Sequence, residues 1–418
     1  MDGMKIYTFD LVINPPVGSC VAGYGPQDES WEIHDDLMMN ALLMDDGKRK
    51  SALLGFDLIG MDSTMVQEIR KGCAEILQTE ESQVILSCTH THGGPHSRST
   101  YRNARLQPYC DELVEKVLAG CRDVVRQEWR ETSVYFYSAS APVNINRRYC
   151  GPENVCRFLP HWRSLEPLAD GVTDPEIGML FFRDAKTMVP VEIVINYAAH
   201  PLASHARGLG GHAVTADYPG LIRKLVYDAT RAHCTFVTGA AGDQFPIDSE
   251  IGWQNLDTIA KPIVREVTRG MCEAFCFPER FKLESPEVKS RIVPFVSPLR
   301  PGFPEERRRP SQQGKEQYEL ELQLLSIGDI CFVGVPGELV GELGLEIKWH
   351  TPFRKAFILY NSTGYVSYIC HANAFVSGGY EPHMQHLEYK AGLKLVNAAV
   401  DAMFDMHDNA IAMPVYTK

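Results

Sequence analysis

The stretch that most constrains the fold covers residues 84–96, which read Val-Ile-Leu-Ser-Cys-Thr-His-Thr-His-Gly-Gly-Pro-His. Its first five residues form a compact apolar run, which predicts a buried strand. The run stops at His90 and His92, and the Gly-Gly-Pro that follows forces a turn. Residues two apart in an extended chain point to the same side, so both imidazoles can face one pocket. Because neutral imidazole is a common zinc ligand, a metal site is predicted here, with two solvated histidines as the alternative.

Composition narrows the class of protein. The chain has 418 residues, 44% of them apolar and 22% charged, which is typical of a globular protein with a large core. The net charge of −12 argues against nucleic acid as a partner. Twelve cysteines without CxxC spacing read as reduced thiols. No segment has the length of a membrane span or the layout of a signal peptide. We expect a cytoplasmic protein with a small-molecule substrate and no membrane partner; homo-oligomerisation stays open.

The segments before the histidine pair predict a βαβ unit. Apolar runs at 37–43 and 52–58 flank an Asp-Asp-Gly turn and read as a hairpin. Apolar residues then recur at helical spacing over 64–78, and the strand at 84–88 follows. Strand, helix and strand in this order give parallel strands with a right-handed crossover. His90 would therefore lie just past the carboxyl end of a parallel strand, where α/β sheets place their ligands.

The rest of the chain extends this pattern, and we expect one α/β domain over residues 1–418. A mixed, largely parallel sheet should be flanked by helices, with the metal site at the carboxyl ends of the strands. Residues 139–187 read as irregular and polar, and residues 284–316, rich in Pro and Arg, read as a surface excursion. Further expected elements are helices at 108–127 and 388–404, strands at 134–137, 191–197, 234–238 and 356–360, and a hairpin at 319–335.

Three more strand ends carry side chains that bind metals. The strand at 191–197 runs to His200-Pro201, the hairpin runs into Glu338, and the strand at 356–360 is followed by Tyr365 and Tyr368. Four unrelated coincidences are less probable than one shared site, so these residues are predicted to meet His90. Each has an ordinary alternative: His200 as a capped strand end, Glu338 as the start of a helix and Tyr368 as a core tyrosine.

The order of these motifs resembles the catalytic domain of the neutral, non-lysosomal ceramidase family. The most specific match is Thr-His-Thr-His-Gly-Gly-Pro, and weaker matches keep the same order along most of the chain. These weaker matches are Ile13-Asn-Pro-Pro-Val-Gly, Ala22-Gly-Tyr-Gly, Ile33-His-Asp, Asn146-Arg147, His200-Pro201, Ala216-Asp-Tyr-Pro-Gly, Gly242-Asp243, Pro336-Gly-Glu338 and Tyr365-Val-Ser-Tyr368.

The resemblance implies a zinc amidase with a single metal. Its ligands would be His90, His200, Glu338 and Tyr368, the second tyrosine of the Tyr-x-x-Tyr pair. The position of His92 resembles that of a family histidine that supports the ligands or contacts the substrate, and Arg147 lies where the family carries a substrate-side arginine. From the chemistry of these side chains we predict His92 for proton transfer or contact with the oxyanion and Arg147 for holding a polar or anionic group of the substrate, with Tyr365 as a further catalytic residue. Arg148 is the alternative to Arg147, because the register of the two arginines against the family is open.

Two departures from the family point away from ceramide. The family shows Gly-Asp-Val-Ser-Pro, with a serine near the reaction centre, whereas residues 242–246 read Gly-Asp-Gln-Phe-Pro and place Phe245 at that position. Long ceramidases also carry a β-sandwich domain after the catalytic one and are secreted or membrane-associated. Here the tyrosine motif lies close to the end of the chain, and no β-sandwich domain is expected. Both departures favour a smaller, more polar substrate.

The predicted ligands support hydrolysis without a protein nucleophile. Two histidines and a glutamate leave open positions on zinc, which can lower the pKa of bound water to about 7 and polarise a carbonyl. A Gly-x-Ser-x-Gly elbow and a phosphate-binding glycine loop are absent from the sequence. We therefore predict a zinc-dependent hydrolase that cleaves an amide or ester of a small soluble molecule. The alternatives are a metal-dependent isomerase or lyase acting on a polar metabolite such as a sugar derivative, or a zinc-binding protein without hydrolytic activity.

Overall fold

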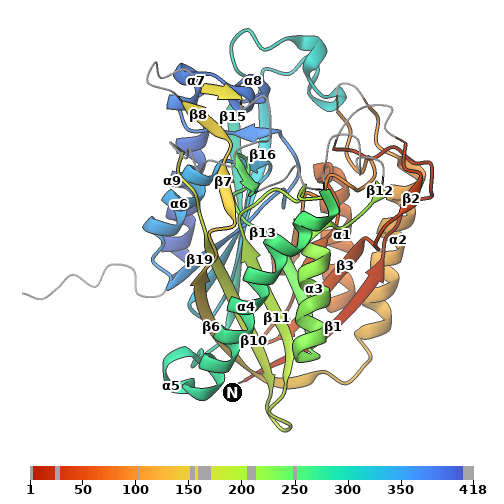
Figure 1. Ribbon diagram of the computed structural model, residues 1–418, viewed down its shortest axis with the longest axis vertical. Helices are drawn as coiled ribbons and strands as arrows, with labels where there is room; N and C mark the ends of the chain where they lie inside the picture. Colours follow the sequence, from red (N-terminus) through yellow and green to blue (C-terminus); the bar gives the residue numbers. More distant parts are fainter. Residues whose placement is uncertain are drawn as a thin grey trace, which may run out of the picture.

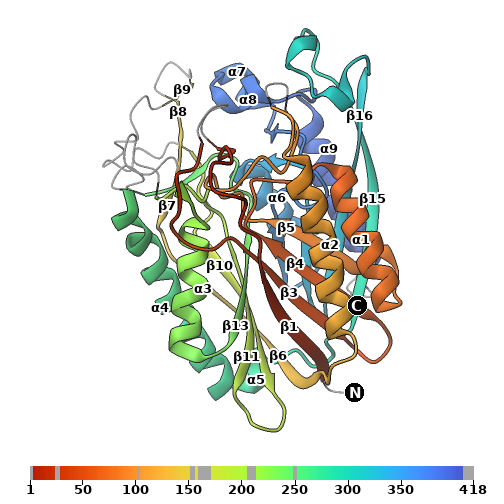
Figure 2. The ribbon, with the colours of Figure 1, turned by 90° about the vertical axis from the view of Figure 1, so that its right-hand side faces the viewer.

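The computed structural model describes residues 3–23, 29–100, 103–150, 156–158, 171–204, 213–247 and 252–407. It has four layers, with two β-sheets packed face to face and helices on both outer sides (Figures 1 and 2). The apolar core between the sheets includes Leu53 and Phe182 of the large sheet and Phe332 and Phe357 of the small one. Since both sheets bury both faces, most of their strands are continuous apolar runs.

The large sheet has eight strands and the small sheet has four. The large sheet runs in the order β13 (His233–Thr238), β11 (Pro190–Tyr197), β10 (Glu176–Asp184), β6 (Arg130–Ser140), β1 (Met4–Val12), β3 (Met38–Asp45), β4 (Lys50–Phe56) and β5 (Val84–Cys88). The small sheet runs in the order β15 (Val288–Pro298), β16 (Gln317–Ile327), β17 (Ile330–Gly334) and β19 (Lys355–Leu359).

Two helix pairs cover the outer face of the large sheet, and one pair covers the small sheet. The pair α1 (Ser63–Leu77) and α2 (Gln107–Val124) packs over β3, β4 and β5, and the pair α3 (Asp217–Thr230) and α4 (Asn255–Cys276) packs over β6, β10, β11 and β13. On the small sheet lie α6 (Gly341–His350) and α9 (Ala391–Met406). The short helices are α5 (Pro278–Phe281), α7 (Asn373–Ser377) and α8 (Tyr380–Met384). Among the described residues, no helix is both long and apolar enough to cross a bilayer.

Short strand pairs lie outside the two sheets. They are β2 (Glu32–Ile33) with β12 (Ala213–Val214), β7 (Asn144–Asn146) with β14 (Gln244–Pro246), β8 (Arg148–Cys150) with β9 (Cys156–Phe158), and β18 (Glu338–Leu339) with β20 (Tyr368–Ile369). The pairs β7–β14 and β18–β20 matter most for function, because they carry expected site residues.

The expected α/β class with a mixed sheet flanked by helices is confirmed, and so is the βαβ unit β4–α1–β5. Within the two sheets, however, parallel pairs occur only as β4–β5, β11–β13 and β17–β19, and the strands between β11 and β4 pair antiparallel. The short pairs β2–β12 and β18–β20 outside these sheets are also parallel. The expectation of a largely parallel sheet therefore holds at the edges only. The reason is local: tight turns join β3 to β4, β10 to β11 and β16 to β17, and such turns force antiparallel pairing.

Two other expectations were wrong. Residues 139–187 are not irregular throughout, because β10 occupies 176–184 as a buried strand of the large sheet. Residues 284–316 are not a surface excursion throughout, because β15 pairs with β16 along its whole length. Since β15 is an edge strand, it tolerates Pro294 and alternates exposed with buried residues, a pattern that reads as a loop in the sequence.

A buried ion pair ties α3 to the ends of β4 and β5. Asp57, directly after β4, is completely buried and accepts hydrogen bonds from Arg223 Nη1 at 3.1 Å, from Met38 N at 2.9 Å and from Thr89 Oγ1 at 3.2 Å. Thr89 is the residue just before His90. The ion pair therefore fixes the backbone that carries the first predicted metal ligand.

Replacing Arg223 with methionine should cost about 3–5 kcal/mol of unfolding free energy, because it leaves the buried Asp57 carboxylate without its cation. Urea denaturation followed by circular dichroism measures this loss. The control is Arg231→Met, which removes an exposed arginine and should change stability by about 0.5 kcal/mol or less. A loss of less than about 1 kcal/mol for Arg223→Met would contradict this role for the ion pair.

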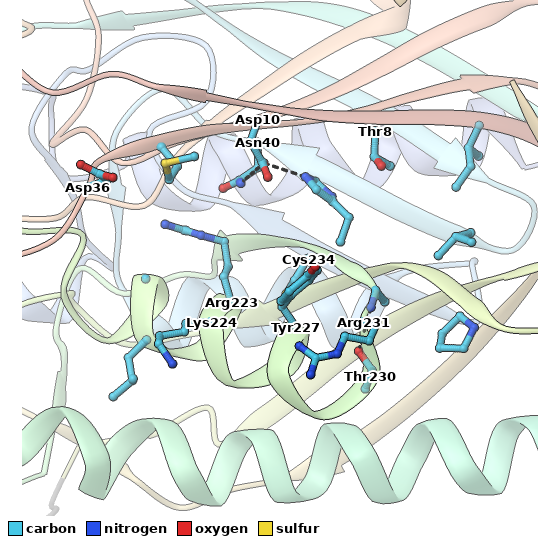
Figure 3. A pocket seen from close by; sticks show the side chains of 18 of the residues that line it. Thr8, Asp10, Asp36, Asn40, Arg223, Lys224, Tyr227, Thr230, Arg231 and Cys234 are labelled. Atoms are coloured by element: carbon cyan, nitrogen blue, oxygen red, sulfur yellow. Dashed lines mark hydrogen bonds and ion pairs between the residues drawn. The ribbon is translucent and has the colours of Figure 1, made fainter. Parts of the chain in front are cut away.

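A second charged cluster lies in a cavity of about 1110 Å³ between β1, β13 and α3. His233 Nε2 lies 2.7 Å from Asp10 Oδ1, and its Nδ1 contacts Glu192. Asp10 also accepts a hydrogen bond from Asn40, and Figure 3 labels both of these residues. Burial opposes protonation of His233, but Glu192 and Asp10 outweigh it and raise its pKa to about 10. Arg223, from α3, is the nearby cation that acts on Asp10.

The His233 cluster should make stability fall as the pH rises above neutrality. A histidine whose folded pKa is about 10 contributes its full stabilisation below its unfolded pKa of about 6.5 and loses it as the pH approaches 10. The slope is at most about 1.4 kcal/mol per pH unit for one proton. Unfolding free energies measured between pH 7 and 10 should show a clearly flatter slope for His233→Asn. His350→Gln, on the exposed end of α6, is the control and should keep the slope of the unmodified protein.

Candidate metal centre

Two imidazoles face one carboxylate oxygen at the end of the sheets. His90 follows β5, His200 follows β11, and Glu338 lies on β18. His90 Nε2 is 3.5 Å and His200 Nε2 is 3.4 Å from Glu338 Oε2. Two ligand atoms held tetrahedrally at about 2.1 Å from one zinc ion would lie about 3.4 Å apart, so the three atoms are spaced as zinc ligands would be.

The other ring nitrogens of both histidines are held by backbone carbonyls. His90 Nδ1 lies 2.6 Å from the carbonyl oxygen of Ile59, and His200 Nδ1 lies 2.5 Å from that of Ala241. An Nδ1–H that donates to a carbonyl leaves the Nε2 lone pair for a metal, as metal-binding histidines generally do. Burial also lowers the pKa of His200 to about 4, which keeps its imidazole neutral at physiological pH.

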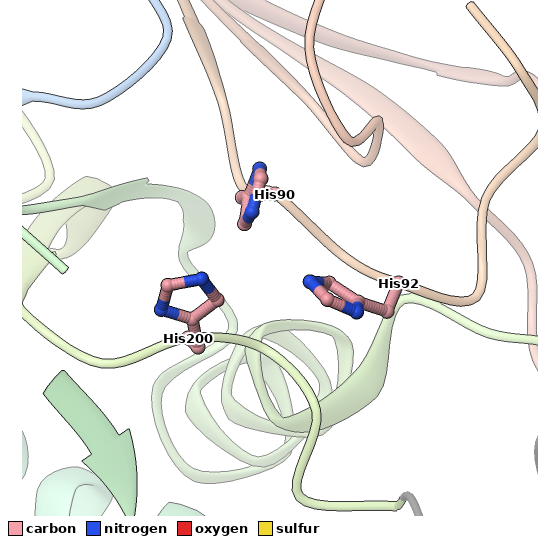
Figure 4. A group of neighbouring side chains, drawn as sticks. All are labelled: His90, His92 and His200. Atoms are coloured by element: carbon pink, nitrogen blue, oxygen red, sulfur yellow. The ribbon is translucent and has the colours of Figure 1, made fainter. Parts of the chain in front are cut away.

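A third histidine completes the group. His90, His92 and His200 each offer a ring nitrogen, and these three atoms all lie within 4.8 Å of one another. Figure 4 shows the three imidazoles around a common space, His90 and His92 from one chain segment and His200 from another. The i, i+2 spacing thus brings both histidines to one pocket, as the sequence predicted.

The backbone at His90 is strained, and neighbouring strands hold it in place. Its φ is 70°, in the left-handed region that residues other than glycine rarely adopt. Its N–H donates to the carbonyl of Leu58 at 2.9 Å, and Thr89 N donates to that of Phe56 at 2.8 Å. Such a conformation costs about 1–3 kcal/mol and is found mainly at functional sites.

Two tyrosines donate hydrogen bonds to the Glu338 carboxylate. The Tyr360 hydroxyl donates to Oε2 at 3.0 Å, and the Tyr365 hydroxyl donates to Oε1. Two hydroxyl donors on one carboxylate favour its ionised form and fix its orientation. The carboxyl group is therefore ionised and oriented, as a metal ligand must be.

Two glycines allow the close packing behind the site. A Cβ at Gly23 would lie 2.2 Å from Cβ of His92, and one at Gly242 would lie 2.9 Å from the carbonyl oxygen of Glu338. Real Cβ atoms do not approach so closely, so a larger residue would displace the His92 side chain at position 23 or the backbone of Glu338 at position 242.

The remaining predicted residues form a second group beside the first. The Tyr368 hydroxyl accepts a hydrogen bond from Arg147 Nη2 at 3.0 Å, and Arg147 Nε donates to Glu381 at 2.5 Å. Arg148 Nη1 donates to the same carboxylate at 2.7 Å, but its other nitrogen reaches the carbonyl of Gly378. Of the two arginines, Arg147 is therefore the one that contacts Tyr368.

Phe245 stands between these two groups. It lies on β14, is almost completely buried, and its ring centroid is 5.2 Å from that of His200. The guanidinium carbon of Arg147 lies 4.4 Å from the centre of the Phe245 ring. The position that carries a serine in the resembled family is therefore filled by an aromatic ring packed on a predicted metal ligand.

A pocket of about 200 Å³ opens onto the site. Among its lining residues are His90, His92, Glu338, Tyr365 and Tyr368. Sequence reasoning missed Arg98, Arg307, Arg309 and Tyr380. It placed His386 in a loop near the pocket and quoted His96 in the histidine motif, but it gave neither of them a role. Among these residues His96 and Arg98 carried a usable signal, since both follow the histidine pair within the same turn-rich stretch. The arginines at 307–309 belong to the segment that was expected to lie on the surface.

Comparisons with known proteins find likeness in structure only. No protein-family model matches the chain, and no curated protein matches it in sequence. A solved structure of the neutral ceramidase from Pseudomonas aeruginosa superposes with a TM-score of 0.76 over 97% of this chain and 75% of that one, at 14% identity. A structure described as ceramidase complexed with C2 gives a TM-score of 0.77 over 98% and 77%, also at 14% identity.

These likenesses extend over nearly the whole chain, although few residues are identical. The motifs from Thr89 to Tyr368 pointed to the same relationship independently of the structure. The chain therefore has the fold of the neutral ceramidases, the family that the order of its motifs resembles.

Proposed function

We propose that the protein is a zinc-dependent hydrolase that cleaves the amide or ester bond of a small soluble substrate with water as the nucleophile. The observation that carries the proposal is the convergence of His90 Nε2 and His200 Nε2 on one oxygen of Glu338, at 3.5 and 3.4 Å. The likeness in fold to solved structures of ceramidases adds support.

In this proposal His90, His200 and Glu338 hold the ion, and the Tyr368 hydroxyl is a further, labile ligand. A bound zinc ion would polarise the substrate carbonyl and lower the pKa of bound water to about 7. His92 stays in the catalytic role predicted from the sequence, although its ring nitrogen lies close enough to His90 and His200 to be an alternative ligand.

The chain's own residues then move protons and orient groups. The attacking water forms a bond to the carbonyl carbon, the carbon–nitrogen or carbon–oxygen bond breaks, and the proton lost by water ends on the leaving group. His92 takes that proton and returns it, because it faces the same space as the other two imidazoles (Figure 4). Tyr365 orients Glu338 through its hydrogen bond, and Arg147 orients the hydroxyl of Tyr368.

Phe245 bears on whether a side chain attacks the substrate. A buried phenylalanine against His200 offers no nucleophile where the resembled family has its serine. A mechanism in which water attacks the substrate directly does not require a serine at this position. Because Phe245 replaces the serine of the resembled family, two alternatives without hydrolysis remain: a metal-dependent isomerase or lyase, and a zinc-binding protein without hydrolytic activity.

Substituting alanine for His90 or His200 should remove most of the zinc, because each variant loses one of three convergent ligand atoms. Elemental analysis of the purified variants measures the metal per chain. The matched control is His96→Ala, which changes a histidine of the same pocket outside the three-histidine group and should keep its metal. Full zinc in both the His90 and His200 variants would refute the ligand assignment.

Hydrolysis in ¹⁸O-labelled water should place one heavy oxygen in the released acid without a covalent enzyme adduct. A panel of small N-acyl and O-acyl compounds, assayed with and without a chelator, identifies a usable substrate, and intact-mass spectrometry searches for an acyl-enzyme. A trapped adduct would contradict direct attack by water. Metal-loaded protein that releases no acid from any member of the panel would favour the non-hydrolytic alternatives.

A further inference from the structure

Two buried arginines line the pocket next to the candidate metal centre. Arg98 is only 9% exposed, and its Nε atom has no hydrogen-bond partner in the described part of the chain. Arg309 is 7% exposed, and its nearest carboxylate oxygen, on Asp62, lies 3.7 Å from Nη1. Burying a guanidinium without a closely bonded anion is unfavourable, so these two arginines lower the stability of the folded protein through their desolvation.

Both guanidinium groups lie over the same aromatic ring. The guanidinium carbon of Arg98 is 3.6 Å and that of Arg309 is 4.5 Å from the centre of the Tyr365 ring. Cation–π contacts of this kind offset part of the cost of desolvation but do not neutralise the charge. Burial lowers the pKa of Arg309, and the neighbouring charge of Arg98 lowers it further.

The charges of the pocket are unbalanced. Among its described lining residues Glu338 is the only carboxylate, and it already faces two histidines and two tyrosines. On the positive side the lining holds Arg98, Arg307 and Arg309. Burial, assisted by Arg309, lowers the pKa of His386 to about 3, so this histidine stays neutral beside them. The local excess of positive charge contrasts with the net charge of −12 of the whole chain.

We propose that this pocket selects substrates with an oxyanion, specifically a carboxylate, held by Arg98 and Arg309 beside the scissile bond. The inference rests on the proposed hydrolase function and adds the substrate class. Guanidinium groups bind carboxylates through paired hydrogen bonds, and the substrate would supply a counter-charge that the described lining residues do not provide.

Geometry limits where the carboxylate can lie in the substrate. The Tyr365 hydroxyl contacts Glu338, while its ring contacts both arginines, so about one phenol ring separates the anion site from the metal centre. The volume of about 200 Å³ lies below the usual range for drug-sized ligands, about 300–1,000 Å³. Both points favour a compact molecule such as an N-acyl amino acid, whose carboxylate lies a few bonds from the amide.

Binding tests the inference without any need for turnover. Metal-free protein is titrated with N-acetylglycine and with its neutral counterpart N-acetylglycinamide. We expect the acid to bind about tenfold more tightly or better, since a hydrogen bond to a charged group contributes about 1.5–3 kcal/mol. In Arg98→Met and Arg309→Gln this preference should fall to about threefold or less.

The control variant changes a comparable arginine outside the pocket. Arg105 pairs with Asp62 at 3.8 Å, as Arg309 does at 3.7 Å, but it does not line the pocket. Arg105→Gln should therefore keep the preference for the acid. Circular dichroism verifies that each variant is folded, and Arg98→Lys, which keeps the charge but loses the paired donors, covers the case in which Arg98→Met does not fold.

The outcomes separate this inference from the proposed function. Equal binding of acid and amide, or a preference that survives in both arginine variants, would overturn the inference even if neutral amides were hydrolysed. Tighter binding of inorganic phosphate or sulfate than of N-acetylglycine would overturn the assignment to a carboxylate. Arginine-dependent binding of the acid by a protein that hydrolyses no acyl compound would support the anion site and refute the hydrolase.

Discussion

The site depends on one contact, in which Glu338 Oε2 faces the Nε2 atoms of His90 and His200. Both histidines follow strands of the large sheet, whereas the glutamate follows a strand of the small one. The apolar core between the sheets therefore determines the spacing of the candidate ligands, because any sliding of one sheet over the other would separate them. The hydrogen bond from Thr238 Oγ1 to the carbonyl of Thr89, at 2.8 Å, fixes the neighbouring strand ends as well.

What the sequence could predict was local. The histidine pair, His200-Pro201 and Glu338 could be recognised because each follows a short apolar run that reads as a buried strand. The way these ends meet could not be read from the same runs, since it depends on two sheets packing face to face. Edge strand β15 was missed for the same reason: its prolines and arginines look like a loop until pairing with β16 is known.

The arginines of the pocket escaped prediction because burial is a tertiary property. In the sequence, Arg98 and Arg309 stand in turn-rich stretches where a solvated charge is the ordinary expectation. Only the fold shows that both are more than nine-tenths buried and that, among the described residues, neither has a carboxylate within hydrogen-bonding distance. These two buried arginines and the left-handed backbone of His90 lower the stability of the folded protein at the site. The Asp57–Arg223 ion pair and the continuous apolar core between the sheets offset that loss.

Tyr365 connects the two halves of the site. Its hydroxyl donates to Glu338, and its ring lies beneath the guanidinium groups of Arg98 and Arg309. Two cations over the ring draw electron density from the phenol, which strengthens its O–H as a donor to the carboxylate. An anion bound by the arginines would weaken that pull, so the basicity of Glu338 would depend on whether the anion site is filled. On the proposed assignments, substrate recognition and the electronic state of a metal ligand are coupled through one aromatic ring.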